Sequence, residues 1–91
     1  MAINVRIPPI LRETTGGERA VQGSGPTVAA VLEDLEQRHP GFRDRLFSDD
    51  GELRRFVNIY VNDEDIRYLA QLNTPVQDGD TLSILPAVAG G

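Results

Sequence analysis

The clearest strand pattern in this chain is Phe56-Val57-Asn58-Ile59-Tyr60-Val61-Asn62. Strict alternation places Val57, Ile59 and Val61 on one face of an extended segment. The opposite face carries Phe56, Asn58, Tyr60 and Asn62. A turn is expected at Asn62-Asp63-Glu64-Asp65, because Asn and Asp tolerate the backbone conformations that turns require. This stretch therefore predicts a long, half-buried strand that ends in a tight turn.

Two further strands are predicted, one near each end of the chain. Residues 2–7 alternate until Pro8-Pro9 ends the pattern, and their apolar face consists of Ile3, Val5 and Ile7. Residues 81–85 alternate with Leu82 and Ile84 inward and with Ser83 and Leu85 outward. Pro86 ends this strand because proline has no N–H to donate to a sheet ladder.

Weaker patterns fill the gaps between these strands. The turn Thr14-Thr15-Gly16-Gly17 is followed by a short strand over residues 18–22, which would form a hairpin with residues 2–7. We expect regular secondary structure to be interrupted at Gly23-Ser24-Gly25-Pro26 and a turn at Gln77-Asp78-Gly79-Asp80. Ile66–Leu69 is a short apolar segment of uncertain type, and Ser48–Glu52 is a polar loop.

One amphipathic helix is predicted in the middle of the chain. Thr27 has the side chain of a helix N-cap, since its hydroxyl can accept a bond from an unpaired backbone N–H. The apolar residues that follow it are spaced i, i+3, i+4, i+7, namely Val28, Val31, Leu32 and Leu35. His39-Pro40-Gly41 ends the helix, and Phe42–Phe47 is expected to form one further short turn.

The order of these elements is a hairpin, a helix and then further strands. One helix can cover one face of one sheet, which gives a two-layer α+β domain. The layout resembles the ubiquitin-like β-grasp fold, with a mixed sheet of four to five strands and one main helix packed on one face. In that arrangement the first and last strands are central neighbours. Residues 1–86 would form the domain, and residues 87–91 a flexible tail.

Composition excludes several classes of function. The 91 residues carry a net charge of −5, which argues against nucleic acid or an anionic membrane as partner. No apolar run approaches the roughly 20 residues that span a bilayer, and the N-terminus does not have the pattern of a signal peptide. We therefore expect a cytoplasmic protein. Cysteine is absent, so disulfides and cysteine metal sites are excluded.

The tail Ala87-Val88-Ala89-Gly90-Gly91 contains the candidate reactive group. Two residues without a β-carbon are thin enough to carry a terminal carboxylate into a narrow active site. Pro86 fixes φ at the root of the tail and would stiffen it. All nine basic residues are arginine, so no lysine side chain can attack an activated terminus. The carboxylate of Gly91 is the expected site of chemistry, with Ala87, Val88, Ala89 and Gly90 as its access.

Nearly the whole chain resembles the ubiquitin-like sulfur carriers, which include the small subunit of molybdopterin synthase and the thiamine-pathway carrier. It is most similar to the actinobacterial carrier for cysteine biosynthesis. The stretches that carry the resemblance are Ile7-Pro8 with Ile10-Leu11-Arg12, Thr15-Gly16-Gly17, residues 55–65 and residues 84–91. Because these carriers share the same tail, spacing alone does not choose between the three pathways.

The resemblance implies a mechanism. An ATP-dependent enzyme would adenylate Gly91, and a sulfur donor would displace AMP to leave a C-terminal thiocarboxylate. In the cysteine branch, a pyridoxal-phosphate (PLP) cysteine synthase that uses O-phosphoserine would accept the sulfur, and a zinc peptidase would release cysteine. The chain would be a co-substrate and not an enzyme, with no catalytic side chain and no bound cofactor or metal. A protein modifier that joins its terminus to lysines, and a pure interaction module with an inert tail, are the alternatives.

Docking of these partners is expected on the outer face of the sheet. An apolar patch of Phe56, Tyr60 and Leu85 would mark the surface, unless some of these side chains pack under loops. Arg54 and Arg55 either pair with acidic groups of a partner or are solvated surface charge. Asp63-Glu64-Asp65 lacks the ligand spacing of a calcium loop, so turn chemistry explains it better. His39 has no second ligand nearby in the sequence and is expected to be structural.

Overall fold

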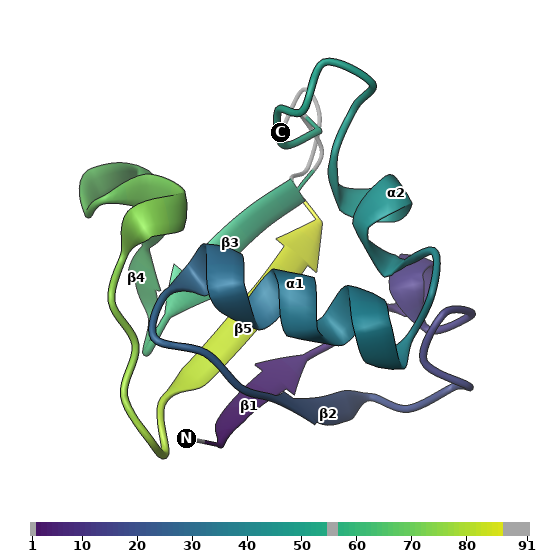
Figure 1. Cartoon of the computed structure of the whole chain (residues 1–91), viewed down its shortest axis with the longest axis horizontal. Coiled ribbons are helices and arrows are strands. Elements are labelled where there is room, and N and C mark those ends of the chain that lie inside the picture. Colours follow the sequence, from purple (N-terminus) through teal and green to yellow (C-terminus); the bar gives the residue numbers. More distant parts are fainter. Residues whose placement is uncertain (1, 55–56, 87–91) are drawn as a thin grey trace.

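The computed structural model describes residues 2–54 and 57–86, which form a five-stranded mixed sheet with one main helix across it (Figure 1). The strand order is β2-β1-β5-β3-β4. The strands are β1 (Ile3–Arg6), β2 (Ala20–Gly23), β3 (Val57–Val61), β4 (Glu64–Asp65) and β5 (Thr81–Pro86). The predicted α+β class, the mixed sheet and its single main helix are confirmed.

Strand β5 lies in the centre of the sheet. It pairs in parallel with β1, where Arg6 lies opposite Ser83, and antiparallel with β3, where Val57 lies opposite Pro86. The first and last strands are therefore neighbours, as predicted. Strand β5 is paired with β1 along its first half and with β3 as far as Pro86. The last described residue is therefore still held in the sheet by hydrogen bonding with a neighbouring strand.

The helical elements lie on one face of the sheet or at its margins. Helix α1 (Val28–Arg38) crosses the sheet in Figure 1, and α2 (Phe42–Leu46) follows it. Three short 3-10 helices complete the set: η1 (Pro9–Leu11), η2 (Ile66–Tyr68) and η3 (Gln71–Asn73). Within the described ranges, no helix is long and apolar enough to cross a membrane.

The core fills the space between α1 and the sheet. The apolar positions of α1 predicted from its periodicity, Val28, Val31, Leu32 and Leu35, are all buried. They pack with the inward residues of four strands and with Phe42 and Leu46 of α2. Residues of the opposite face alternate with the buried ones along β1 and β3, and they are exposed or half-buried. One face of the sheet is therefore buried in the core beneath α1, and the other face is accessible to solvent.

Two predicted boundaries are wrong in the first half of the chain. The second strand covers Ala20–Gly23 rather than residues 18–22, so Gly23 belongs to the strand and not to the following break. Gly23 lies against α1, and a β-carbon there would come within 2.9 Å of Val31 Cγ1. A glycine that permits close packing of a helix on a strand has the same sequence signature as a turn glycine, which explains the error.

The hairpin after β3 also differs from the prediction. The turn comprises only Asn62 and Asp63, which have φ of 50° and 74°. Glu64 and Asp65 form β4, paired with Val61 and Tyr60. A two-residue turn with positive φ at both positions has the twist that a tight hairpin requires, and Asn and Asp tolerate this conformation. The residue types of the turn were predicted correctly, but the turn has two residues rather than the four that were predicted.

We expect Thr27→Ala to lower the free energy of unfolding by about 1 kcal/mol, because the capping bond is lost. The Thr27 hydroxyl accepts from the Ala30 N–H at 3.2 Å at the start of α1. Urea titration of both proteins measures the difference. Thr27→Ser keeps the hydroxyl and should stay close to wild type. Equal losses in the Ala and Ser variants would show that the cap contributes nothing.

Candidate functional site

The candidate site is the end of β5 and the surface that surrounds it. Pairing with β1 stops at Ser83, whereas pairing with β3 continues to Pro86. Beyond Arg6 the chain turns away through Pro8 into η1. A groove about 520 Å³ in volume opens where β1 leaves β5, and we call it the tail-root groove. Its lining residues include Pro8, Pro9, Arg12, Tyr60 and Leu85, together with Arg6, Ile7, Arg19, Asp63, Ser83 and Ile84.

The outer face of the sheet supplies the floor of this groove. Strand register places Arg6, Ser83 and Tyr60 in one row across β1, β5 and β3. The next row toward the end of β5 contains Leu85 opposite Asn58. Leu85 is 45% exposed and Tyr60 is half-buried. Leu85 thus presents apolar area to solvent one residue before the last described position.

Two of the four predicted docking residues are placed by the structure, and it brings them together. Tyr60 and Leu85 share the outer face and both line the tail-root groove. Arg55 and Phe56 lie outside the described residues, as do Ala87, Val88, Ala89, Gly90 and Gly91. The role of the outer face in docking stays a prediction, but its apolar side chains are accessible where the prediction needs them.

Sequence reasoning missed the contribution of the segment after β1. Pro8-Pro9 was used only as the end of a strand, yet both prolines line the tail-root groove. Ile10 next to them is 47% exposed. An apolar residue directly after two prolines, on a segment that cannot continue the sheet, was the available signal. This signal does not show how far the segment lies from β5, because that distance depends on the register of β1 against β5.

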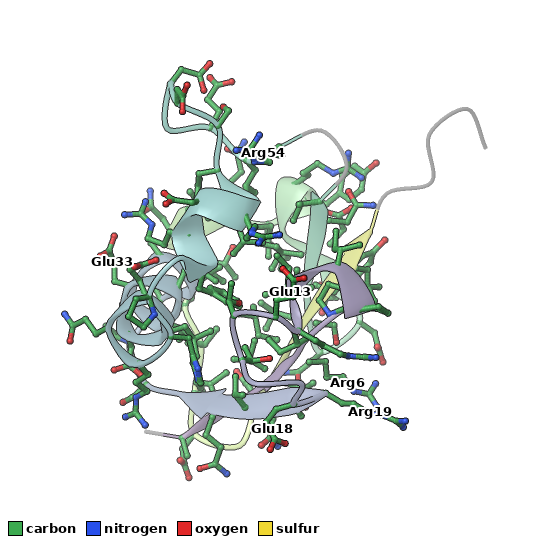
Figure 2. All side chains as sticks on the ribbon, turned by 90° about the vertical axis from the view of Figure 1, so that its right-hand side faces the viewer. Arg6, Glu13, Glu18, Arg19, Glu33 and Arg54 are labelled. Carbon is green, nitrogen blue, oxygen red and sulfur yellow. The ribbon has the colours of Figure 1, made fainter. Side chains whose placement is uncertain are left out.

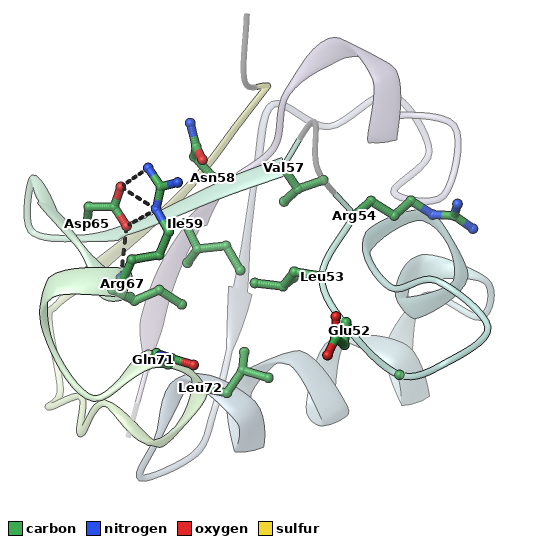
Figure 3. A pocket seen from close by; sticks show the side chains of 12 residues that line it. Glu52, Leu53, Arg54, Val57, Asn58, Ile59, Asp65, Arg67, Gln71 and Leu72 are labelled. Carbon is green, nitrogen blue, oxygen red and sulfur yellow. Dashed lines mark hydrogen bonds and ion pairs between the residues drawn. The ribbon is translucent and has the colours of Figure 1, made fainter. Parts of the chain in front are cut away.

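A second hollow, of about 470 Å³, lies at the open edge of β3 beyond the two residues that pair with β4. Figure 3 shows Leu53, Ile59 and Leu72 around its apolar interior. At its rim, Arg67 contacts the buried carboxylate of Asp65 at 2.7 Å through Nη2 and at 3.1 Å through Nε. The backbone N–H of Arg67 also donates to Asp65 Oδ1 at 2.9 Å. The cation and the buried carboxylate at this rim are therefore paired with each other within the chain.

His39 and Arg54 lie at helix ends or near them. The backbone N–H of His39 donates to the Leu35 carbonyl at 2.7 Å at the end of α1, and the structural role of its side chain stays a prediction. Arg54 donates through Nη2 to the Asp44 carbonyl at 3.0 Å. No cluster of three or more His, Asp or Glu side chains that could hold a metal ion occurs in the parts of the chain that the structure describes.

Asp65 and Arg67 make stability depend on pH. The hydrogen bonds from the Arg67 side chain hold the pKa of the Asp65 carboxyl below its ordinary value of 3.8, although burial opposes the shift. Because the pKa of Asp65 is lower in the folded state, its ionised carboxylate stabilises the folded protein at pH above 3.8. This stabilisation is lost as the pH falls through the folded-state pKa. We expect Arg67→Gln to lower the melting temperature at pH 7, because it leaves a buried carboxylate without its cation.

The difference between wild type and Arg67→Gln should shrink as the pH falls below 3.8, where the Asp65 carboxyl becomes protonated. Thermal unfolding across a pH series measures this. Arg38→Gln is the control, because Arg38 pairs with Asp34 at an exposed helix surface and should contribute little. A melting difference for Arg67→Gln that stays constant down to pH 2 would contradict the assignment.

Comparison with known proteins agrees with the fold. The ThiS family model matches residues 5–91. The sulfur carrier protein CysO of Mycobacterium tuberculosis is 54% identical over 93 residues, which cover 100% of both chains. A crystal structure of CysO from that organism has a TM-score of 0.90, 51% identity, and coverage of 94% of this chain and 99% of that one.

Two other relatives bear on partners and on alternative roles. The crystal structure of the Amycolatopsis orientalis BexX/CysO complex matches with a TM-score of 0.89 and 53% identity, over 99% of this chain and 100% of that chain. Small archaeal modifier protein 3 of Haloferax volcanii is 40% identical over 65 residues, 71% of this chain and 70% of its own length. The full-length match to CysO and the β-grasp sheet agree, and the chain belongs to the ThiS family of ubiquitin-like sulfur carriers.

Proposed function

We propose that this carrier holds sulfur as a thiocarboxylate at Gly91. The observation that supports this most directly is the family match, which runs through residue 91 and so includes Gly90 and Gly91. The end of β5 lies in the centre of the sheet beside the exposed outer face. A tail that starts there has its root on a rigid strand, with an apolar surface next to it for an enzyme to hold.

The first reaction is activation of the carboxylate. A carboxylate oxygen of Gly91 attacks the α-phosphorus of ATP, and pyrophosphate leaves. A sulfur nucleophile then attacks the acyl carbon, and AMP leaves with the carboxyl oxygen. One oxygen is thereby exchanged for sulfur at Gly91. The activating enzyme supplies the nucleotide site and the acid–base groups, so the carrier is a co-substrate and not an enzyme. The use of ATP places the reaction in the cytoplasm.

The similarity to CysO proteins favours the cysteine branch for the second reaction. On a PLP-dependent cysteine synthase, the thiocarboxylate sulfur would form a bond to the β-carbon derived from O-phosphoserine, whose phosphate leaves, and the new cysteine would be joined to Gly91 through a thioester. The resulting thioester rearranges to an amide, and a zinc peptidase cuts off cysteine and regenerates the carboxylate of Gly91. PLP and zinc belong to the partner enzymes. Donation to molybdopterin or thiamine synthesis would use the same tail and differs only in the acceptor.

Intact mass spectrometry tests the proposal. Incubation with ATP, sulfide and the cognate activating enzyme should add the mass difference between sulfur and oxygen, and fragmentation should place it at Gly91. The product, mixed with the cysteine synthase and O-phosphoserine, should then gain a cysteine residue. Absence of the first mass change would sink sulfur carriage by this chain. If the chain gains sulfur but no cysteine residue, the acceptor of the sulfur belongs to another pathway.

A second candidate function is protein modification. It is favoured by the 40% identity to small archaeal modifier protein 3 of Haloferax volcanii. The terminus would then form isopeptide bonds with lysines of other proteins, and because this chain has no lysine it could not form lysine-linked chains of itself. High-mass conjugates in cell extracts, with no thiocarboxylate on the free form, would favour this function over sulfur carriage.

A further inference from the structure

Positive charge gathers at the tail-root groove, although the chain as a whole is acidic. The groove is lined by Arg6, Arg12 and Arg19 and by one carboxylate, Asp63, which gives it a net charge of +2 in a chain of net charge −5. Other hollows lack this excess. The hollow at the edge of β3 balances two arginines against two carboxylates, and one beside η3 contains only acidic groups, Glu64 and Asp80.

Two of these arginines are available to a partner. In the described parts of the chain, the ion pairs involve Arg38, Arg43, Arg45 and Arg67, and neither Arg6 nor Arg19 takes part. Both side chains are exposed, and Figure 2 shows them side by side, extending away from the body of the protein. Arg12 differs, because its Nε donates to the Ile7 carbonyl at 3.2 Å.

The strand pairing fixes Arg6 and Arg19 next to each other and near the end of β5. The Ile7 N–H donates to the Arg19 carbonyl at 2.8 Å, so the two arginines lie on adjacent strand ends. Arg6 lies opposite Ser83, three residues before Pro86, which is roughly 10 Å along an extended strand. Two unpaired cations held this close repel each other, and a carboxylate placed between them would relieve that repulsion.

We propose that the tail-root groove docks an acidic surface patch on the enzyme that activates Gly91 with ATP, with Arg6 and Arg19 paired to its carboxylates. This inference rests on the proposed function. Guanidinium groups bind carboxylates in a bidentate geometry and are more weakly hydrated than ammonium groups. Pro9, Tyr60 and Leu85 supply the apolar contact area beside the arginines.

The charge asymmetry also orients the encounter. An acidic enzyme surface is repelled by the net negative charge of this chain and attracted by the arginines of the tail-root groove. Complementary charge of this kind raises association rates by a factor of 10 to 10³, and the effect falls steeply with salt. The carrier would therefore approach with the tail-root groove turned toward the enzyme.

The test compares two double variants of the full chain that have the same net charge. Arg6→Gln/Arg19→Gln removes the cations of the groove, and Arg38→Gln/Arg45→Gln removes two exposed arginines on the helical side. Binding to the activating enzyme and the KM for sulfur loading are measured at low and at high salt. We expect the groove variant to bind about 10-fold more weakly at low salt, with kcat unchanged, and the gap to close at high salt, where charges are screened. The control should stay within about twofold of wild type.

Each other outcome is decisive. Equal weakening in both variants would show that net charge alone matters, and tighter binding of the groove variant would show that the partner is cationic; both overturn the proposal. A wild-type chain that binds with the expected salt dependence but gains no sulfur would overturn the proposed function and leave the acidic docking surface supported. A wild-type chain that does not bind the enzyme would overturn both. Melting temperatures of all variants exclude unfolding as the cause.

Discussion

Addition of one alanine after Gly91 is expected to abolish sulfur loading while the protein remains fully folded. The proposed reaction occurs at the terminal carboxylate, and the added residue moves that carboxylate about 3.3 Å further along the chain. A misplacement of about 1 Å at a reacting centre already costs roughly 100-fold in rate. The new terminus would also carry a β-carbon, which a channel shaped for two glycines must exclude. We expect a loss of at least about 100-fold, measured by intact mass after incubation with ATP, sulfide and the activating enzyme.

The matched control inserts the same alanine between Met1 and Ala2. It has the same mass as the extended variant, and it lies at the opposite end of the sheet, because β1 and β5 are parallel and Pro86 is at the far end of β5. This control should load sulfur at the wild-type rate. Both variants should melt at the wild-type temperature, since the buried core lies between Ile3 and Ile84. If the extended chain gains sulfur as fast as the control, the terminal-carboxylate mechanism is wrong.

Most of the fold was predictable because burial dictates the local pattern. Alternation in β1, β3 and β5 and the i, i+3, i+4, i+7 spacing in α1 each follow from one apolar face meeting one core. The errors occur where a residue type serves two purposes. Gly23 permits close packing on Val31 rather than a turn, and Asp65 binds Arg67 at the start of η2 rather than extending the turn after β3.

The candidate site was less predictable, because it depends on distances between segments. Tyr60 and Leu85 could be assigned to one face from their alternation, and the structure places them in one groove. Arg6 and Arg19 belong to the two strands of the predicted hairpin, but neither segment shows the register that makes them neighbours. Sequence spacing determines which face a side chain occupies, whereas strand register determines its neighbours. The charge at the root of the tail is therefore a property of the pairing of β1 with β2 and β5.

Phe42→Ala should be the most destabilising single change in the body of the protein. The Phe42 side chain at the start of α2 is fully buried and belongs to the core beneath α1. Truncation of a buried Phe costs about 3–5 kcal/mol, through lost burial and the cavity that remains. A domain of this size has about 5–14 kcal/mol of stability in total. We therefore expect the melting temperature to fall by at least about 12 °C, measured by thermal unfolding.

Tyr68→Ala is the control for Phe42→Ala, because it also truncates an aromatic side chain but one that is 83% exposed. Its effect should stay within about 0.5 kcal/mol. Equal losses in the two variants would show that α2 does not pack as described. The same pair separates stability from function, because Phe42 is buried in the core and is not among the residues that line the tail-root groove. Below its melting temperature, the Phe42→Ala variant should load sulfur at the wild-type rate per folded molecule. Any decrease in the loading rate should therefore equal the fraction of molecules that are unfolded. A loss beyond that fraction would mean that α2 takes part in recognition by the activating enzyme.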